Sequence, residues 1–292
     1  MRSNVSEYEL IAPGTLKGVL QTLADKPGEY LPVAGGTEVM VMLGVGRLAQ
    51  KKLISLWGVK ELRFIRETET TLTIGAGATF TDIRKNKIIA KEFPLLALAA
   101  SWTGSIANQN RGTLGGNIVN ASPAADTPPA LLAYDATVEI VSARGSRMLE
   151  YRAFHKGYKK IALEPDELLY AVHIPRRFAD SFQRLRKVGT RNAMAISKVA
   201  LAIVAKKTGD VVSEIAIGGA SVREMPYRCI AAEAAVRGKA LNAATIASAR
   251  AALAGEIAPI DDIRSTGRYR AQVVCNILED FLTELQNDLQ HR

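Results

Sequence analysis

Apolar residues in the first sixty positions follow first a helical and then a strand-like pattern. Helical spacing is seen at Leu16, Val19, Leu20 and Leu23. Thr15 precedes this run as a plausible cap, and a KPGE segment ends it. A short strand, LPVAGG, then leads into an apolar helix, TEVMVMLGVG, and a further strand, KKLISLWGV. The pattern predicts a small strand–glycine–helix unit.

The next hundred residues favour a sheet with helices. Alternate positions are apolar at Leu72, Ile74, Ala76 and Ala78, which predicts the second strand of a hairpin-like pair. Residues 82–91 and 94–101 have helical patterns, and strands are expected in ATVEIVSARGSRMLEY and ELLYAVHIP.

The composition changes after Pro175. Two or three strands are expected in FQRLRKVGTRNAMAISKVALAIVAKKTGDVVSEIAIGGA, with a turn at KTGD, and helices over 230–237, 244–254 and 269–285. The last helix has a single apolar stripe: Val273, Val274, Ile277, Leu278, Phe281, Leu282 and Leu285. We therefore expect one domain over residues 1–176, with subdomains of about 1–58 and 59–176, and a second over 177–292.

Composition narrows the class of protein. The 292 residues are 48% hydrophobic and 23% charged, as in an ordinary globular chain. A net charge of +9 admits a nucleic acid, an anionic membrane surface, or an acidic or phosphate-bearing partner. Only 6% of residues are aromatic, and no basic run is interleaved with stacking aromatics. Nucleic-acid binding is therefore disfavoured.

The location expected from the sequence is the cytoplasm. The longest apolar run, PLLALAA, is too short to span a bilayer, and the N-terminus lacks the apolar core of a signal peptide. Cys229 and Cys275 form no CxxC pair, which provides no ligand set for zinc or an iron–sulfur cluster. We expect two buried, reduced thiols and no metal site.

Several familiar catalytic patterns are missing from the sequence. There is no GxxxxGK[ST] loop, HExxH or GxSxG. His155, His173 and His291 are widely separated, and a structural role is favoured for His173. GVGRLA at 44–49 formally matches a dinucleotide fingerprint, but it lies where a helix ends, so these glycines are better explained as a C-cap.

Two other glycine-rich segments carry more chemistry. In VAGGTE, at 33–38, Gly35 and Gly36 let backbone N–H groups turn toward an anion, and Thr37 could both cap the next helix and bind a phosphate. An ordinary strand-to-helix turn is the alternative. Gly115 and Gly116 repeat the pattern between Thr113 and Asn117.

The second segment continues with Ser122 and Asp126. The Asp126 carboxylate could accept a hydrogen bond from a sugar hydroxyl, and Asp126 could also cap the helix that starts at TPPALL. Two anion-binding segments in one domain predict a dinucleotide-like ligand bound outside a Rossmann site.

Four segments, in order and spacing, carry a resemblance to a known family. LPVAGGTEVMV, RGTLGGNIVNASPAADTPPALLAYDA, GYKKIALEPDELLYAVHIP and GASVREMPYR resemble the FAD-binding medium subunit of molybdenum hydroxylases, the family of xanthine dehydrogenase and carbon monoxide dehydrogenase. The resemblance covers about residues 5–285. It implies an α+β fold: a two-subdomain FAD-binding domain of the vanillyl-alcohol-oxidase (PCMH) type, then a C-terminal three-stranded antiparallel sheet with helices.

The resemblance also implies FAD-contacting residues. It places the pyrophosphate at Val33, Ala34, Gly35, Gly36, Thr37, Glu38, Thr113, Gly115, Gly116 and Asn117. Ser122 and Asp126 match positions that reach the sugar and ribityl region.

Contacts nearer the rings are implied at four further positions. Leu168 and Leu169 match apolar residues beside the isoalloxazine or adenine. Lys198 matches a lysine near the flavin ring, although a surface lysine on a strand is the alternative, and Tyr158 matches a tyrosine on the acceptor side. The chain departs from the family at Gln109, where arginine is usual.

The implied function is electron transfer. FAD would receive electrons from [2Fe–2S] clusters of a small subunit, a large molybdopterin subunit would oxidise the substrate, and an acceptor such as NAD or a quinone would be reduced. The expected assembly is a heterotrimer, which could also dimerise, without catalytic side chains on this chain. A self-contained FAD oxidase or dehydrogenase, and a basic nucleic-acid-binding or scaffold protein, are the alternatives.

Overall fold

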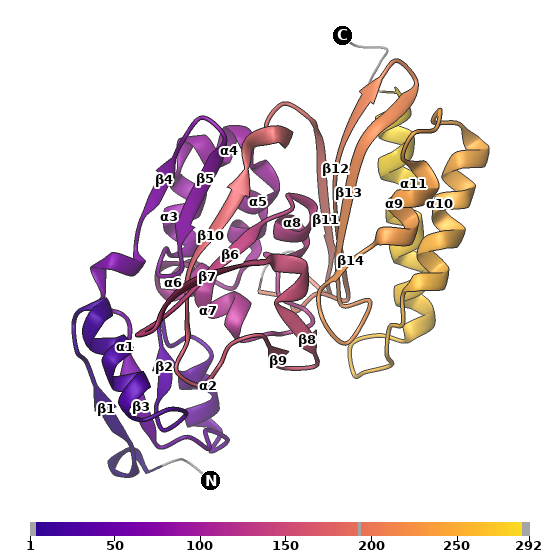
Figure 1. Ribbon diagram of the computed structural model, residues 1–292. Helices are drawn as coiled ribbons and strands as arrows, with labels where there is room; N and C mark the ends of the chain where they lie inside the picture. The colour runs from indigo at the N-terminus through magenta and orange to yellow at the C-terminus, as the bar shows by residue number, and fades with distance from the viewer. Residues whose placement is uncertain (1–3, 192–193, 288–292) are drawn as a thin grey trace.

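The computed structural model describes residues 4–191 and 194–287. Within these residues the strands form a three-stranded, a five-stranded and a four-stranded sheet and one two-stranded ribbon. The fold is α+β, with the first two sheets in the first part of the chain and the four-stranded sheet in the second (Figure 1).

The first sheet is small and parallel, in the order β1-β3-β2. Its elements are η1 (Val5–Glu7), β1 (Glu9–Ile11), α1 (Leu16–Asp25), β2 (Leu31–Val33), α2 (Val39–Gly44), β3 (Lys52–Ser55) and η2 (Lys60–Leu62). Helix α1 begins as the sequence predicts, because the Thr15 side chain accepts a hydrogen bond from the Gly18 N–H. Val19 and Leu23 of α1 are buried, and they anchor the helix to this sheet.

The second sheet is antiparallel, in the order β4-β5-β10-β6-β7. Its strands are β4 (Ile65–Glu67), β5 (Thr71–Gly75), β6 (Thr137–Ser142), β7 (Gly145–Glu150) and β10 (Leu168–Pro175). The predicted alternation is confirmed for Leu72 and Ile74, whereas the strand ends at Gly75, so Ala76 and Ala78 are buried beyond it rather than within it. Three short elements connect β7 to β10: η3 (Tyr151–Ala153), β8 (His155–Gly157) and β9 (Lys160–Ile161). A further one, η4 (Arg176–Phe178), follows β10.

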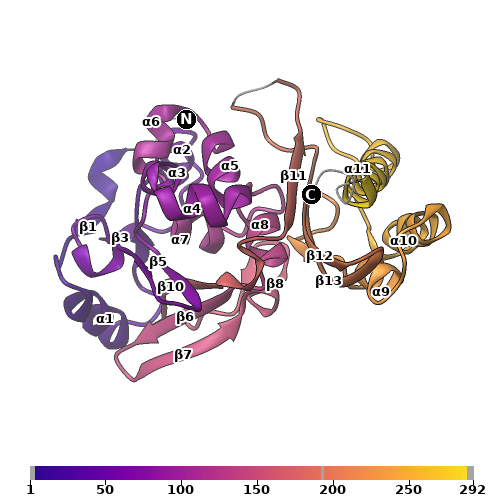
Figure 2. The same ribbon diagram turned by 90° about the horizontal axis from the view of Figure 1, so that it is seen from above.

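Five helices, α3, α4, α5, α7 and α8, share the apolar core on one face of the five-stranded sheet, and α6 lies beside α3 (Figure 2). Their bounds are α3 (Phe80–Lys85), α4 (Lys87–Glu92), α5 (Pro94–Trp102), α6 (Ile106–Arg111), α7 (Leu114–Val119) and α8 (Pro128–Ala133). The single helix expected over 82–91 is in fact two helices. Asn86 is extended and its side chain accepts from the N–H groups of Ile88 and Ile89, so it starts a new helix.

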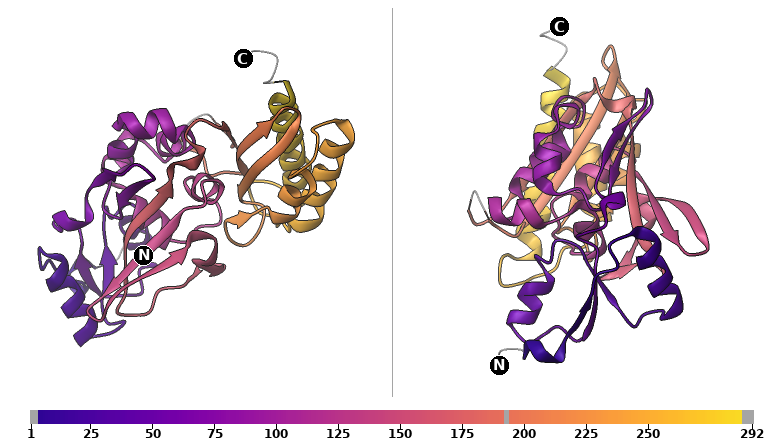
Figure 3. Two further views of the ribbon diagram at one scale, coloured as in Figure 1. Left: turned by 45° about the horizontal axis from the view of Figure 1, so that its top comes forward. Right: turned by 90° about the vertical axis from the view of Figure 1, so that its left-hand side faces the viewer.

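The last sheet has the order β11-β12-β13-β14 and is antiparallel. It comprises β11 (Phe182–Val188), β12 (Val199–Thr208), β13 (Val211–Ala220) and β14 (Tyr227–Arg228). The three expected strands are present, and a two-residue fourth strand adds to them. The outer face carries α9 (Ile230–Val236), α10 (Ala243–Glu256) and α11 (Gly267–Asn287), as Figure 3 shows.

Helix α8 connects the two halves of the molecule. All six of its residues are buried, and it packs on the inner face of the last sheet. The approach is so close that a Cβ on Gly218 of β13 would lie 2.3 Å from the Pro129 carbonyl oxygen. Only glycine permits this contact, and the position of α8 is therefore tied to both halves.

The structure tests the sequence expectations on the two cysteines and on His173. Both cysteines are free and buried, and the described residues contain no cluster of side chains suited to a metal ion. His173 has a structural environment, with the Thr73 hydroxyl 3.0 Å from Nδ1 and Glu139 3.1 Å from Nε2. His291 lies outside the described residues. Among the helices described, none is long and apolar enough to cross a membrane.

Candidate functional site

The two glycine-rich segments meet at one place. A Cβ on Gly35 would lie 1.7 Å from the Arg111 carbonyl oxygen, just ahead of the second segment. The Arg111 Nε also donates to the Gly35 carbonyl at 3.4 Å. Backbone therefore packs directly on backbone, and Gly35 is required for this approach.

The first turn presents unused backbone donors. Among the described residues no acceptor receives the N–H groups of Gly35, Gly36, Thr37 and Glu38. Gly36 holds a φ of +77°, a conformation that glycine adopts freely. Such a row of N–H groups is suited to an anion with several oxygens.

Thr37 does not cap α2, so that expectation is wrong. The residue before the helix is Glu38, whose backbone is already helical and whose side chain makes no capping bond. The reason is that the chain enters α2 one residue later than the pattern suggested. The glycines of GVGRLA behave as expected: Gly44 ends α2, and Gly46 has a φ of +71°.

The second turn is built differently from the first. Its two glycine N–H groups are already used, Gly115 donating to the Ala76 carbonyl at 2.9 Å and Gly116 to the Thr113 hydroxyl at 3.1 Å. Gly115 packs against the sheet, because a Cβ there would lie 2.6 Å from that of Ala76. Gly116 is exposed, and its added Cβ would meet only Thr113 Oγ1 within 4 Å. Gly116 thus leaves an open face on the second turn.

The polar side chains after this turn hold its shape. Asn117 Oδ1 accepts from the Thr127 hydroxyl at 2.6 Å, and Ser122 Oγ accepts from the Ala124 N–H at 3.3 Å. Both bonds fix the path of the chain from α7 to α8.

Asp126 does not cap α8, contrary to the second role expected for it. The capping position is Thr127, and Asp126 instead accepts from Lys187 Nζ at 2.7 Å and from the Ser197 hydroxyl at 3.3 Å. Both members of the Asp126–Lys187 pair are largely buried. Burial raises the pKa of the Asp126 carboxyl, while Lys187, Ser197 and Thr103 act to lower it.

Lys187 is a site residue that the sequence interpretation missed. It is the last residue but one of β11, sixty-one positions after Asp126, and reaches it only because the last sheet docks on α8. No local spacing signals such a pair. Lys198, the lysine singled out from the sequence, points elsewhere: its Nζ lies 5.4 Å from the centre of the Tyr269 ring.

The other predicted ring contacts are dispersed. Leu168 and Leu169 start β10 with buried side chains, which pack into two different apolar clusters. Tyr158 is exposed in the β8–β9 turn. Beside it Lys159, with a φ of +57°, donates to the Asn120 carbonyl at 2.6 Å and to its side chain at 2.9 Å.

Comparison with known proteins decides the family. Residues 6–177 match the family described as the FAD binding domain in molybdopterin dehydrogenase, and residues 184–285 match the CO dehydrogenase flavoprotein C-terminal domain. The chain belongs to the FAD-binding subunits of the molybdenum hydroxylase family. The family resemblance inferred from the four sequence segments is confirmed, as is FAD as the cofactor.

Relatives match over nearly the whole chain. The xanthine dehydrogenase FAD-binding subunit of Escherichia coli is 30% identical over 92% of this chain and 93% of its own length. The glyceraldehyde dehydrogenase medium chain of Sulfolobus acidocaldarius is 31% identical over 92% and 94%. Among solved structures, carbon monoxide dehydrogenase from Hydrogenophaga pseudoflava aligns with a TM-score of 0.90 and 27% identity over 94% and 95% of the two chains.

The quinoline 2-oxidoreductase of Pseudomonas putida 86 shows the same architecture. It aligns with a TM-score of 0.88 and 26% identity, over 96% of this chain and 97% of that chain. The α+β fold, an FAD-binding domain followed by a C-terminal domain, is thereby confirmed for this flavoprotein subunit.

The geometry of the flavoprotein subunit fits its cofactor. FAD contains a pyrophosphate, and the first turn, which touches the second at Gly35 and Arg111, offers four N–H groups without an acceptor among the described residues. A cavity of about 460 Å³ lies at the Asp126–Lys187 end, lined by Trp102, Lys187, Val188 and Thr190. A ligand with a charged middle and an aromatic end matches this layout.

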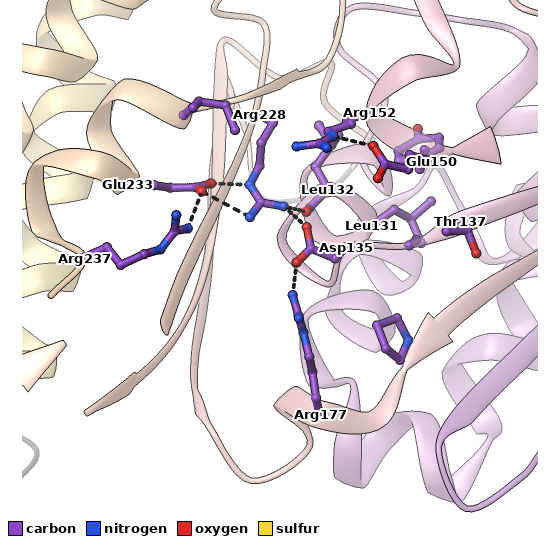
Figure 4. Close-up of a pocket in the computed structure, with 14 residues that line it drawn as sticks. Leu131, Leu132, Asp135, Thr137, Glu150, Arg152, Arg177, Arg228, Glu233 and Arg237 are labelled. Carbon is purple, nitrogen blue, oxygen red and sulfur yellow. Dashed lines mark hydrogen bonds and ion pairs between the residues drawn. The ribbon is translucent and has the colours of Figure 1, made fainter. Parts of the chain in front are cut away.

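A second cavity, of about 520 Å³, lies between α8, β7 and α9 (Figure 4). Its charged side chains are paired with one another: Asp135 binds Arg177 and Arg228, and Glu233 binds Arg228 and Arg237. These ion pairs join the two halves of the flavoprotein, so this cavity lies at the interface between its two domains.

His155 gives stability a predictable pH dependence. Its buried Nε2 donates to the Ile118 carbonyl of α7 at 3.1 Å, and the rings of Tyr151 and Phe154 lie edge-on to it. Burial lowers the pKa of His155 below its ordinary value of 6.5. The unfolded chain therefore binds more protons than the folded one below that pH, so the free energy of unfolding falls as pH drops through and below 6.5.

We expect His155→Phe to remove that part of the pH dependence. At neutral pH it should cost about 0.5–1.5 kcal/mol, because the Ile118 carbonyl loses the His155 donor but keeps the Ala121 N–H at 3.1 Å. Urea unfolding of both proteins between about pH 8 and about pH 5.5 measures the two effects. The prediction would be contradicted if the free energy of unfolding changed equally steeply with pH in the two proteins over this range.

Proposed function

We propose that this chain is the FAD-containing electron-transfer subunit of a molybdenum hydroxylase complex. In this role it takes electrons from the [2Fe–2S] clusters of a partner subunit and passes them to an external acceptor of the NAD or quinone class. The observation that carries the proposal is the pair of glycine turns, which touch at Gly35 and Arg111 and in which four backbone N–H groups of the first turn have no acceptor among the described residues.

FAD would lie across the two turns. Its pyrophosphate would accept hydrogen bonds from the backbone of residues 35–38 and pass over Gly116, with Val33, Ala34, Thr113 and Asn117 shaping the walls. Ser122 and Asp126 would lie toward the sugar and ribityl part. Leu168 and Leu169 are enclosed in the core, so we assign them a supporting rather than a contacting role.

The ring end would lie near the cavity beside Lys187. The flavin supplies the electron-transfer chemistry when bound, and the chain binds and orients it. The buried ammonium of Lys187 places a cation at this end of the site, although the Asp126 carboxylate that it binds balances much of its charge. Such a charge favours an electron-rich ring, a role the sequence interpretation gave to Lys198. Tyr158 and Lys198 remain proposed contacts at the rim.

The proposal extends to the assembly. The names of the relatives describe FAD-binding subunits and medium chains of larger dehydrogenases. We propose a heterotrimer with a small [2Fe–2S] subunit and a large molybdopterin subunit, located in the cytoplasm. We also propose a domain boundary near residue 176, with a division of the first domain near residue 58; the two family matches, which end at 177 and begin at 184, support the former.

Two measurements test the function. The purified chain should be yellow and release one FAD per chain on denaturation, and a colourless protein that takes up no added FAD would refute the proposal. In the purified complex, the flavin should be reduced on addition of the substrate of the molybdenum subunit. The isolated chain should stay oxidised with the same substrate; its direct reduction would instead favour a self-contained FAD dehydrogenase.

A further inference from the structure

In the cavity of about 520 Å³ between the two domains, which we name the interdomain cavity, three guanidiniums share two carboxylates. Arg228 lies between Asp135 and Glu233 and binds both. Arg177 binds the other oxygen of Asp135, and Arg237 donates to Glu233 at 3.1 Å (Figure 4). These five side chains form one chain of ion pairs across the domain interface.

The charges that line the interdomain cavity do not balance. The lining contains four arginines and three carboxylates, and the fourth arginine, Arg152, forms a balanced pair of its own with Glu150. One positive charge is therefore in excess around the shared carboxylates. In a concave site such an excess attracts an anion rather than a cation.

The existing ion pairs leave arginine donors over. Both oxygens of Asp135 and both oxygens of Glu233 already accept from guanidiniums. Arg177 and Arg237, in contrast, each donate through one terminal nitrogen alone. No acceptor among the described residues receives their Nε or their second terminal nitrogen, so the carboxylates of the cavity do not satisfy these two guanidiniums.

The two guanidiniums are accessible and belong to different parts of the molecule. The side chain of Arg177 is 50% exposed and that of Arg237 is 52% exposed. Arg177 lies in η4, on the connection between the two domains, and Arg237 follows α9. A ligand that accepts from both would therefore join the interdomain connection to the last domain.

The interdomain cavity is separate from the site where we place FAD. Asp126, which binds Lys187, precedes α8, whereas Asp135 follows the end of the same helix. The volume of the cavity lies within the range of sites for small molecules, about 300–1,000 Å³. Guanidiniums bind the oxygens of a phosphate or a carboxylate through paired N–H groups.

We propose that the interdomain cavity binds a small molecule with a phosphate or carboxylate group, whose oxygens accept hydrogen bonds from Arg177 and Arg237. The bound anion neutralises the excess charge and fastens the two domains together. The inference depends on the fold of this chain and not on the electron-transfer role.

The test uses the FAD-loaded chain, in which the backbone donors of the first turn are already occupied by the cofactor. Calorimetric titrations with inorganic phosphate, adenosine monophosphate and succinate are made at constant ionic strength, with chloride as the reference anion. At least one probe should bind with saturation at one site per chain and raise the midpoint of thermal unfolding. The tighter probe distinguishes a phosphate from a carboxylate ligand.

Arg177→Gln combined with Arg237→Gln should weaken this binding by at least about 10-fold, because charge-assisted hydrogen bonds to the anion are lost. Arg63→Gln combined with Arg184→Gln is the matched control. These two arginines are also about half exposed, each pairs with a carboxylate at the surface, and one lies in each domain. The control removes the same charge and should bind the probe as the wild type does.

A second variant avoids breaking any ion pair. Ile230 lines the interdomain cavity, is 45% exposed and is the first residue of α9, where an acidic side chain is tolerated. Ile230→Asp should keep one FAD per chain but repel the anion and weaken its binding by at least about 10-fold. Ile230→Asn, of the same size and without charge, should retain the binding.

Three results would overturn the proposal. In the first, chloride raises the unfolding midpoint as much as the probes do, which is the effect of general ionic screening. In the second, the probe binds unchanged in both the arginine double variant and Ile230→Asp. In the third, no probe binds and the arginine double variant instead loses a subunit from the native complex, which would identify a carboxylate of a partner chain as the occupant.

Discussion

Gly116→Val should produce a folded protein that no longer retains FAD. The added side chain would meet only the Thr113 hydroxyl, 3.0 Å from its Cβ, and would otherwise occupy the open face on the second turn. The cost to folding should stay within about 1–3 kcal/mol, as for a modest overpacking. The affinity for FAD should fall by at least about 100-fold, or about 2.8 kcal/mol, because a branched side chain would stand where we place the pyrophosphate.

The measurement is flavin content after purification, followed by titration of the apoprotein with FAD. Gly255→Val is the matched control, since Gly255 also lies in a helix and no atom is within 4 Å of its added Cβ. This control should keep one FAD per chain. Full flavin content in Gly116→Val would show that the pyrophosphate does not lie beside Gly116.

Gly35→Ala should fail in a different way. Its Cβ would lie 1.7 Å from the Arg111 carbonyl, so the two turns would have to separate. We expect lower thermal stability together with loss of FAD, whereas Gly116→Val should lose FAD alone. The contrast distinguishes the glycine that joins the turns from the glycine that leaves space for the ligand.

Local patterns predicted much of this fold correctly. Helical spacing located α1, with Thr15 as its cap, and strict alternation located β5, with Leu72 and Ile74 facing the core. These features depend on a few neighbouring residues and on the period of the side chains. Each glycine turn was also recognised from its own residues, and the structure shows that the two turns touch at Gly35 and Arg111.

The sequence failed where a side chain is satisfied by a distant partner. Asp126 was predicted to cap the helix that follows it, but it binds Lys187 instead. Lys187 lies close to Asp126 only because the two domains pack together. Gly115 and Gly116 look equivalent in the sequence, yet one packs on Ala76 and the other faces open space. Asn86 divided an expected helix because its side chain competes for backbone donors. Such outcomes depend on tertiary contacts, which periodicity does not encode.

Arg228→Met should be the most destabilising of the substitutions considered. Buried Arg228 donates to the Leu132 carbonyl of the first domain at 2.6 Å and is paired with Asp135 there and with Glu233 in α9. Its loss leaves Glu233, itself 2% exposed, with Arg237 and the Ile217 N–H as partners. Removing one partner of a buried ion pair typically costs about 3–5 kcal/mol.

Arg152→Met provides the control from the same cavity, because Arg152 pairs with Glu150 at the surface, where an ion pair contributes at most about 1 kcal/mol. Urea unfolding of the three proteins measures the difference.

The effect of Arg228→Met should extend to FAD, since α8 is held at one end by Asp126–Lys187 and at the other by Asp135–Arg228. Weaker FAD binding in Arg228→Met, with normal binding in Arg152→Met, would show that the interdomain pairs position the flavin site. Unchanged stability in Arg228→Met would mean that burial of Gly218 against Pro129 holds the domains without these charges.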